Sequence, residues 1–373
     1  MGFATFHGNA ETVTRLREMI ERGRLPHAVI LAGPRGAGKY TLAQMAAKAM
    51  NCLERPDNAG LADFCGRCSN CVRIAQADDL DARFTEAVEA REGLKDADKK
   101  DTRVFVQTHP DVLVIPPDPP QMMIKVGQVR HVIENIYFKP QEGRERVFIF
   151  TSTAFIREAE NSLLKVLEEP PDFATIFLLA ENPGELLPTI RSRCVTLTLG
   201  ALPVAEIEAF LSQHPETQHS GAQRTDFSAQ QRALVARLAQ GAIGRARNFD
   251  LAGYIASRTD ALALLRSAIG GDDHSALFRV TETYRAGAEG KGKTDQLLRA
   301  LYLLLEDLMF AKSGTTELIR NTDIAADLAR MAQPVSFDWI AGAAHGLTEV
   351  ERGMRRNLLR SLSLDAFAVS LER

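Results

Sequence analysis

The sequence predicts an α/β domain built on a parallel sheet, followed by a region made only of helices. Three observations support this prediction. Strand-like and helix-like runs alternate as far as residue 200, a glycine-rich loop joins the first strand to its helix, and strand signals disappear from Leu202 onward. Alternating strands and helices are typical of a parallel sheet covered on both faces. A length of 373 residues favours two or three domains, each with its own core.

The composition is that of an ordinary globular protein, with 45% hydrophobic residues, 25% charged residues and a net charge of −3. This charge balance gives no global reason to expect tight binding of nucleic acid. No apolar run approaches the roughly 20 residues that span a bilayer. Residues 1–10 also lack the basic segment and apolar core of a secretory signal. We therefore expect a cytoplasmic protein with no membrane partner, in which disulfides are rare.

A phosphate-binding loop is predicted after the first strand. Apolar side chains at helical spacing predict a helix over residues 10–22, and the apolar run Val29–Ala32 predicts a buried strand. A glycine-rich turn comes next, before a helix-forming run over Leu42–Met50. Backbone N–H groups and a lysine in such a loop can surround a phosphate. The candidate phosphate-binding residues are Gly33, Gly36, Gly38, Lys39 and Thr41.

The loop departs from the full phosphate-loop motif at Tyr40, where a Ser or Thr hydroxyl would hold Mg²⁺. A phenol on a rigid ring cannot occupy the place of a short hydroxyl. The sequence leaves open whether the loop holds ATP or ADP without hydrolysis, or whether Tyr40 fills the pocket.

Four of the five cysteines are crowded between positions 52 and 71. The turn-prone Cys-x-x-Cys-x-x-Cys run and one earlier cysteine offer four thiolates, which favours a structural zinc site in a module over residues 50–75. An iron–sulfur cluster and unliganded thiols are the alternatives, although the spacing lacks the fourth cysteine of a ferredoxin run. Cys194 is expected in a strand and in the core. The predicted zinc ligands are Cys52, Cys65, Cys68 and Cys71.

The rest of the chain follows the same alternation and then turns helical. Residues 78–108 are rich in charge and are expected to form an exposed, partly helical insertion. Further strands are predicted at 111–115, 146–150, 175–180 and 194–199, with helices at 126–138, 158–168 and 184–193. Beyond residue 202, helices are predicted at 204–213, 229–240, 261–269, 297–310, 322–331, 337–347 and 356–371, with a polar loop at 213–226.

The strand over residues 146–150 ends without an acidic residue. In an active phosphate-loop ATPase, carboxylates at this place hold Mg²⁺ and orient the attacking water. Here the strand is followed by Thr151, Ser152 and Thr153, none of which can act as a carboxylate. Together with Tyr40, two separate metal-handling positions are lost, which argues against ATP hydrolysis by this chain.

The next helix and turn carry the run Leu-Leu-Lys-Val-Leu-Glu-Glu-Pro-Pro over residues 163–171. With His27-Ala28 before the phosphate loop, Gly-Pro-Arg-Gly from position 33 and Asn51-Cys52 after its helix, this run resembles the clamp-loader subunits of the AAA+ family. The resemblance covers about residues 5–250. The helical C-terminal third fits by architecture only.

The resemblance implies roles for single residues. Clamp loaders carry a Ser-Arg-Cys triplet whose arginine reaches the ATP site of a neighbouring subunit, and residues 192–194 match it, which places an arginine finger at Arg193. Motor subunits carry an arginine that touches nucleotide at the start of the lid, where this chain has Gly244. Asn182 roughly matches the polar sensor. These positions imply a stator subunit that does not hydrolyse ATP.

The resemblance also implies three domains and a set of partners. An AAA+ α/β domain over residues 1–200 would be followed by a helical lid over 201–253 and a helical collar over 254–373. The collar would assemble head-to-tail with motor (gamma/tau-type) subunits and a delta subunit of a DNA polymerase III clamp loader. Through this complex the chain would act on a sliding clamp and primed DNA during replication.

Three other functions are weighed against this one. An ATP-hydrolysing motor subunit of the same complex is disfavoured by Tyr40, Thr151, Ser152 and Gly244. A free-standing zinc enzyme acting on nucleic acid would need an open metal position and a nearby base, whereas four cysteines leave no position open, and His109 and His131 have no partner in the sequence. A branch-migration motor of the AAA+ class lacks the acidic pair it would need.

Overall fold

The computed structural model describes residues 2–56, 58–95, 98–99, 102–214, 217–219, 222–225, 227–270, 288–355 and 360–371. The chain divides into two compact units. The first comprises residues 1–207 together with 241–245, and the second comprises residues 208–240 and 246–373. Each unit has its own core. Among the described residues, no helix combines the length and apolar character needed to cross a membrane.

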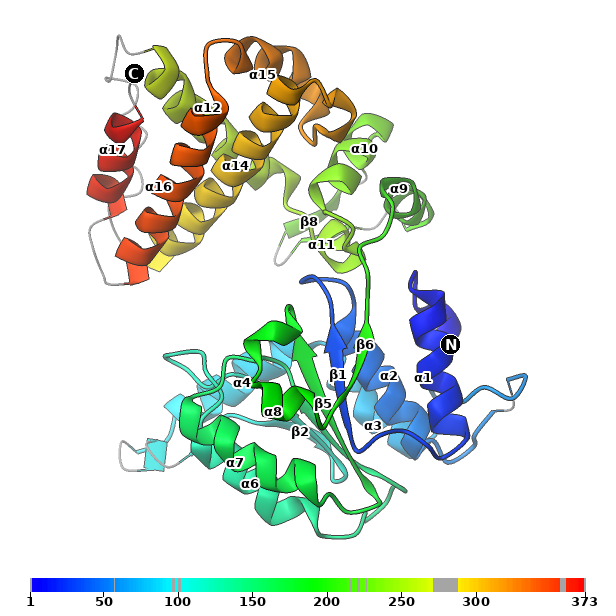
Figure 1. Cartoon of the computed structure of the whole chain (residues 1–373). Coiled ribbons are helices and arrows are strands. Elements are labelled where there is room, and N and C mark those ends of the chain that lie inside the picture. The colour runs from blue at the N-terminus through cyan, green and yellow to red at the C-terminus, as the bar shows by residue number, and fades with distance from the viewer. Residues whose placement is uncertain are drawn as a thin grey trace. The chain divides into compact units, whose positions relative to one another are not determined.

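A six-stranded sheet forms the centre of the first unit, in the order β2-β3-β4-β5-β1-β6. Its strands are β1 (Ala28–Ala32), β2 (Val106–His109), β3 (Val112–Ile115), β4 (Arg146–Phe150), β5 (Ala174–Ala180) and β6 (Val195–Thr198). All neighbours are parallel except β2, which pairs antiparallel with β3 at the edge. Strand β1 lies between β5 and β6, so the loop that follows it leaves from the interior of the sheet (Figure 1).

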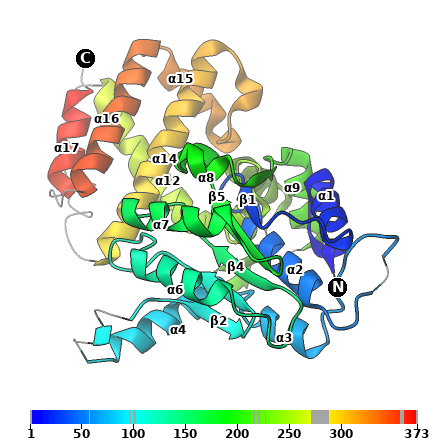
Figure 2. The same ribbon diagram turned by 60° about the horizontal axis from the view of Figure 1, so that its bottom comes forward.

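Helices cover both faces of this sheet, as the alternating sequence predicts (Figures 1 and 2). Because successive strand residues point to opposite faces, Leu31 joins the core under one helical layer and Ile30 joins the core under the other. The first layer is α1 (Ala10–Glu21), α2 (Lys39–Asn51) and α3 (Ser69–Ala75). The second layer is α6 (Val126–Ile136), α7 (Arg157–Glu168) and α8 (Pro188–Arg191).

The charged insertion contains helix α4 (Leu80–Glu92), which begins where the Asp79 carboxylate accepts a hydrogen bond from the Ala82 backbone N–H. The helix is mostly exposed, as expected, and it contacts the edge strand β2. One of its charges is nevertheless buried. Arg91 lies 2.8 Å from Asp118, a fully buried carboxylate. This ion pair ties the insertion to the domain and makes it more than a solvated face.

The second unit is almost entirely helical. Its elements are most of α9 (Val204–Gln213), α10 (Ala229–Leu238), part of α11 (Ile243–Arg247), α12 (Leu251–Gly270), α14 (Ala288–Ser313), α15 (Ala325–Ala332), α16 (Phe337–Arg355) and α17 (Arg360–Ser370). Helix α14 packs against α12, α15 and α16, and buries leucines such as Leu301 and Leu308 completely. Short turns η3 (Thr316–Leu318) and η4 (Thr322–Ile324) lead from α14 to α15.

The structure differs from the predicted elements at four places. Helix α3 (Ser69–Ala75) lies in the cysteine run, where turns were expected. The edge strand β2 was not predicted. The polar loop expected over 213–226 contains a short antiparallel pair, β7 (Thr217–His219) and β8 (Ala222–Thr225). The single helix expected over 184–193 is divided into η2 (Pro183–Glu185) and α8, because Pro188 has no N–H to continue a helix through it.

The other predicted strands and helices are present, and most of their boundaries shift by a few residues. The larger shifts are in long helices: α12 begins ten residues and α14 nine residues before the predicted start, and α16 ends eight residues after the predicted end. The predicted helix over 356–371 begins in residues 356–359, which lie outside the described part of the chain. The predicted boundary at residue 200 falls near the limit of the first unit, and the one at 253 falls inside α12. The division into lid and collar therefore stays a prediction.

Candidate functional site

The phosphate loop connects β1 to α2, and the side chain of Lys39 is bonded to the backbone of the loop. The Lys39 Nζ donates hydrogen bonds to the carbonyl oxygens of Gly33, at 2.6 Å, and Pro34, at 2.9 Å. Burial lowers the pKa of Lys39, the carboxylate of Glu181 opposes this shift, and the charge of Arg35 adds to it. The lysine is thus folded onto the loop. Thr41, in the first turn of α2, is exposed.

Residues 241–245 of the first unit lie directly on this loop. The Gly244 backbone N–H donates to the Gly36 carbonyl oxygen at 2.8 Å. A Cβ atom at position 244 would lie 2.9 Å from that oxygen, closer than real side chains allow. The glycine that stands where motor subunits would carry an arginine is therefore required by packing, because any side chain would separate the two segments.

Tyr40 has a structural partner in place of a metal. Its hydroxyl donates to the Ala77 carbonyl oxygen at 2.5 Å and accepts from the Gln44 side-chain amide at 2.8 Å. Burial raises the pKa of Tyr40, so the phenol stays protonated. The hydroxyl ties the start of α2 to the segment that follows α3. Its proton and one of its lone pairs are used in these two bonds, which hold the hydroxyl at Ala77 and Gln44.

The polar residues after β4 bond to their own surroundings. The Ser152 hydroxyl accepts from the Ala154 N–H at 3.1 Å, and the Thr153 hydroxyl donates to Glu185 at 2.7 Å. The Asn182 side chain, at the predicted sensor position, accepts from the Gly184 N–H at 2.8 Å. No described carboxylate directly follows β4. Glu181, which follows β5, is the acidic group whose charge reaches Lys39.

Glu181 was not predicted as part of this site. The signal that could have identified it is its position after a predicted strand that runs beside β1, since Ala32 and Ala180 pair in register. The carboxyl ends of parallel neighbours lie at one edge, which is where ligands of open α/β sheets bind. The pairing of β1 with β5 follows from sheet topology, which alternation alone does not supply.

The four predicted zinc ligands come together. The sulfur atoms of Cys52, Cys65, Cys68 and Cys71 all lie within 4.8 Å of one another. Four sulfurs bound tetrahedrally at about 2.3 Å from zinc would be about 3.8 Å apart, so the cluster fits this ion with a small contraction. Its chemistry fits too, because four thiolates suit zinc and fill all of its positions.

Backbone N–H groups point at sulfurs of this cluster, and the pKa of the thiols changes in different directions: burial raises the pKa of Cys65 and Cys71. The Cys65 N–H points to the Cys52 sulfur at 3.3 Å, and the Cys68 N–H points to the Cys65 sulfur at 3.2 Å. Burial disfavours the Cys68 thiolate, but hydrogen bonds from the backbone of Cys71 and Leu53 outweigh it and hold its pKa at about 7. Cys194 lies outside the cluster, packs against the core, and has a pKa raised by burial to about 11.

Two asparagines join the cysteine module to the α/β domain. The Asn70 side chain donates to the Asn51 carbonyl oxygen at 3.0 Å, which links α3 to the end of α2. The Asn51 side-chain oxygen accepts from the backbone N–H groups of Arg144 and Glu145 at 2.8 and 3.0 Å. The module is therefore anchored to the loop that precedes β4.

Arg193 lies just after α8, on the layer of helices opposite the cysteine module. Its Nη1 donates to the Thr189 carbonyl oxygen at 2.9 Å, and its Nη2 donates to the Glu168 carboxylate at 2.7 Å. The side chain is 35% exposed, so solvent or another molecule can contact it. The phosphate loop and Arg193 are therefore separate sites, and the sequence did not indicate the partner of the arginine.

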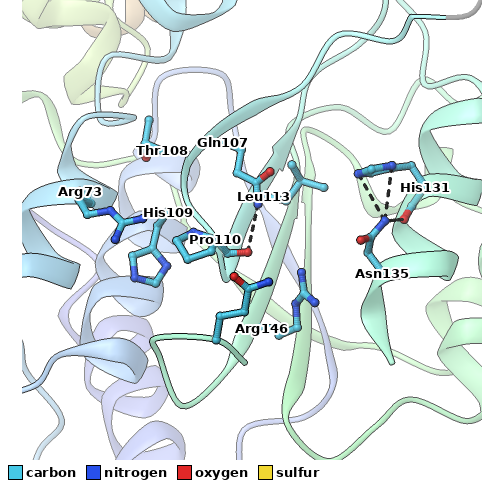
Figure 3. Close-up of a pocket in the computed structure, with 10 residues that line it drawn as sticks. Arg73, Gln107, Thr108, His109, Pro110, Leu113, His131, Asn135 and Arg146 are labelled. Atoms are coloured by element: carbon cyan, nitrogen blue, oxygen red, sulfur yellow. Dashed lines mark hydrogen bonds between the residues drawn. The ribbon is translucent and has the colours of Figure 1, made fainter. Parts of the chain in front are cut away.

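A polar cavity of about 480 Å³ lies at the edge of the sheet near β2 (Figure 3). It brings His109, beside Arg73, and His131, beside Asn135, to the same cavity. The His109 Nδ1 accepts from the Asp111 backbone N–H at 3.1 Å, and burial lowers the pKa of His109. His131 contacts the Asn135 amide and the Phe105 ring. Neither histidine contacts a described carboxylate, so the pair has no acid–base geometry.

Known proteins resemble this chain. A family model described as DNA polymerase III, delta subunit, matches residues 8–203. The tau/gamma subunit of DNA polymerase III from Haemophilus influenzae is 29% identical over 242 residues, which are 65% of this chain and 29% of that protein. The delta-prime subunit of DNA polymerase III from Pseudomonas aeruginosa is 33% identical over 175 residues, 47% of this chain and 43% of that protein.

Solved structures are similar over more of the chain, but at lower sequence identity. A DNA polymerase III gamma subunit-related protein from Thermotoga maritima covers 96% of this chain and 98% of its own, with 17% identity and a TM-score of 0.40. The chain spans less than a third of the length of the tau/gamma relative and less than half of the delta-prime relative. Because the family match extends over just more than half of the 373 residues, the chain belongs to the family described as DNA polymerase III, delta subunit.

Proposed function

We propose that this chain is a clamp-loader subunit of DNA polymerase III that acts as a delta-prime-type stator. In this role it hydrolyses no ATP of its own and supplies Arg193 in trans to the ATP site of an adjacent motor subunit. Its partners are the gamma/tau and delta subunits and, through the complex, the sliding clamp and primed DNA. Family membership and the similarity to a delta-prime subunit support the assignment.

The observation that carries the proposal is that neither of the two usual magnesium-binding positions of a phosphate-loop ATPase has a suitable side chain. The Tyr40 hydroxyl is bonded to Ala77, and the residues after β4 are Thr151 and Ser152. Without a hydroxyl and a carboxylate, nothing at the usual positions neutralises the charge that develops during phosphoryl transfer. Gly244, in contact with Gly36, stands at the position where the lid of a motor subunit carries an arginine that touches nucleotide. ATP or ADP bound at this loop would therefore stay unhydrolysed.

Arg193 has the properties that a finger in trans needs. Its guanidinium offers a planar fork of N–H donors that suits a phosphate, is partly exposed, and lies beyond the end of a helix rather than inside the core. An arginine placed on a transferring phosphoryl group is worth about 10³–10⁵ in rate in the systems where it has been measured. Zinc held by Cys52, Cys65, Cys68 and Cys71 would be structural, because it leaves no position for water.

The test is ATP turnover by the complex reconstituted with its motor and delta subunits. We expect Arg193→Ala to lower the kcat of the complex at least tenfold, with unchanged zinc content and thermal stability of the isolated chain. Arg191→Ala is the matched control, because this neighbouring exposed arginine has no predicted role. If the variant is fully incorporated into the complex and ATP turnover is unchanged, Arg193 does not act as an arginine finger.

The second candidate is the ATP-hydrolysing gamma/tau-type motor subunit. It is favoured by 29% identity over 242 residues to a tau/gamma subunit, a longer match than the one to delta-prime. The two candidates predict opposite behaviour of the isolated chain. Magnesium-dependent ATP hydrolysis by the purified chain at rates typical of ATPases would favour the motor. Calorimetric titration with ATP, with and without Mg²⁺, separates binding from hydrolysis.

A further inference from the structure

Glu168 occupies a position that the local sequence does not explain. It is the last residue of α7, and Glu169 follows it. The C-terminal end of a helix carries partial negative charge, which disfavours a carboxylate and favours a cation. A glutamate here is therefore unfavourable unless a cation accompanies it. Lys165 lies in the same last turn. The cation bonded to the Glu168 carboxylate is the guanidinium of Arg193, at 2.7 Å, although it is 25 residues distant in the chain.

The same guanidinium meets a second helix end. Its Nη1 donates to the carbonyl oxygen of Thr189, in the last turn of α8. Such carbonyls have no partner within their own helix and favour a cation. Arg193 is thus fixed between the ends of two helices that pack against each other. Two of its five N–H groups are used in these bonds, which leaves three for another ligand.

We infer that Glu168 is a positioning residue that fixes the guanidinium of Arg193 in the orientation in which it meets the phosphate of a neighbouring subunit's nucleotide; this inference rests on the proposed function of Arg193. A free arginine side chain samples many rotamers, and each ordered bond formed in advance reduces what must be ordered at the moment of reaction. Because three N–H groups stay free, Glu168 and a phosphate can contact Arg193 together.

The alternative is that the Glu168–Arg193 pair has no function, as holds for many exposed ion pairs. The two cases differ in how substitutions combine. If Glu168 acts only through Arg193, then removing Glu168 has an effect when the arginine is present and none when it is absent. If Glu168 acts independently, the two effects multiply.

The experiment is a double-mutant cycle on ATP turnover by the reconstituted complex. The variants are Glu168→Ala, Arg193→Ala and the double variant, and the readouts are kcat and the KM for ATP at saturating subunit. We expect Glu168→Ala to lower kcat about three- to fivefold with little change in KM. We expect the double variant to match Arg193→Ala alone, and Glu168→Gln, which keeps an acceptor oxygen, to restore at least half of the turnover.

Glu169→Ala is the matched control, since it removes a neighbouring exposed carboxylate at the same helix end, and it should leave kcat unchanged. Two outcomes would overturn the inference and leave the role of Arg193 as an arginine finger unaffected. In the first, the effects of the two substitutions on kcat multiply in the double variant. In the second, the Glu168→Ala and Glu168→Gln complexes both turn over ATP normally while the Arg193→Ala complex is slow. Normal turnover in the Arg193→Ala complex would instead overturn the finger and the positioning role with it. Variants that assemble poorly are identified by gel filtration, and the Glu168→Gln variant then carries the test.

Discussion

At the scale of single residues, Tyr40 forms a structural bond at the position where the full phosphate-loop motif has a Ser or Thr. The hydroxyl of Tyr40 contacts the carbonyl of Ala77 and the amide of Gln44, both of which are buried. A threonine at this position could not reach Ala77 in the same way, because its hydroxyl lies next to the backbone. The Tyr40 side chain therefore joins the phosphate-loop helix to the segment that follows α3.

Replacing Tyr40 by phenylalanine should destabilise the first unit by about 1–3 kcal/mol, because it leaves the Ala77 carbonyl and the Gln44 amide buried without a partner. Urea denaturation with a fixed m-value measures this free energy of unfolding. Tyr137→Phe is the control, since that phenol is 54% exposed and its bond to Glu169 is long, at 3.4 Å. If both variants lose equal stability, the Tyr40 bond has no special role.

The candidate site was predicted from sequence only where its parts are close in the chain. The loop glycines, Lys39 and the cysteine run could be identified because phosphate and metal binding require these residue types at a fixed, short spacing in the sequence. The partners of Tyr40 and Arg193 could not, since Ala77 is 37 residues from Tyr40 and Glu168 is 25 residues from Arg193. Such pairs are created by the packing of one helix against another element, which periodicity does not encode.

At the scale of elements, the cysteine module is a short segment with a limited core of its own. Its helix α3 has seven residues and buries Cys71 and Ile74, while Asn51 and Asn70 anchor it to the domain. Isolated helices of this length are unstable in water. The stability of the module therefore depends on the hydrogen bonds of Asn51 and Asn70 and on the ligand that its four cysteine sulfurs bind.

We expect one zinc ion per chain, and we expect strong chelators to lower the thermal stability of the first unit. Cys68→Ser should remove the ion and lower the melting temperature by about 4–8 °C, as measured by elemental analysis and calorimetry. Cys194→Ser should retain one zinc, because this thiol lies outside the cluster. A metal-free wild-type chain with the same melting temperature after zinc addition would contradict the site.

The strands that were not predicted have a common cause. Strand β2 alternates poorly, with Gln107 and Thr108 in its middle, and it is ordered by pairing with β3. The pair β7–β8 is polar and is likewise defined by hydrogen bonds between two segments. Edge strands and hairpins of this kind depend on a neighbour more than on local propensity. The interior strands were predicted because burial on both faces demands continuous apolar runs.

At the scale of the whole molecule, the two units have different sources of cooperativity. The first is built on the sheet and its two helical layers. The second contains a buried polar network: Arg258 of α12 donates to Asp323 at 2.6 and 2.7 Å and to Asn321 at 2.9 Å. Asp307 of α14 accepts from the Asn321 side chain at 2.8 Å. This network joins two long helices to the turn that leads into α15.

Because each unit has its own core, we expect a lesion in the network to affect the second unit alone. Arg258→Leu should lower its stability by about 2 kcal/mol, since charged hydrogen bonds to Asp323 and Asn321 are lost. Calorimetry should show one transition moving to lower temperature, and hydrogen exchange should show faster opening of α12 and α14 with β1 and β5 unchanged. Arg266→Leu, on the same helix, is the control, because its pair with Asp327 is 3.6 Å long and half-exposed, and it should change stability by less than about 0.5 kcal/mol. Equal loss of protection in the sheet would mean that the chain unfolds as a single unit.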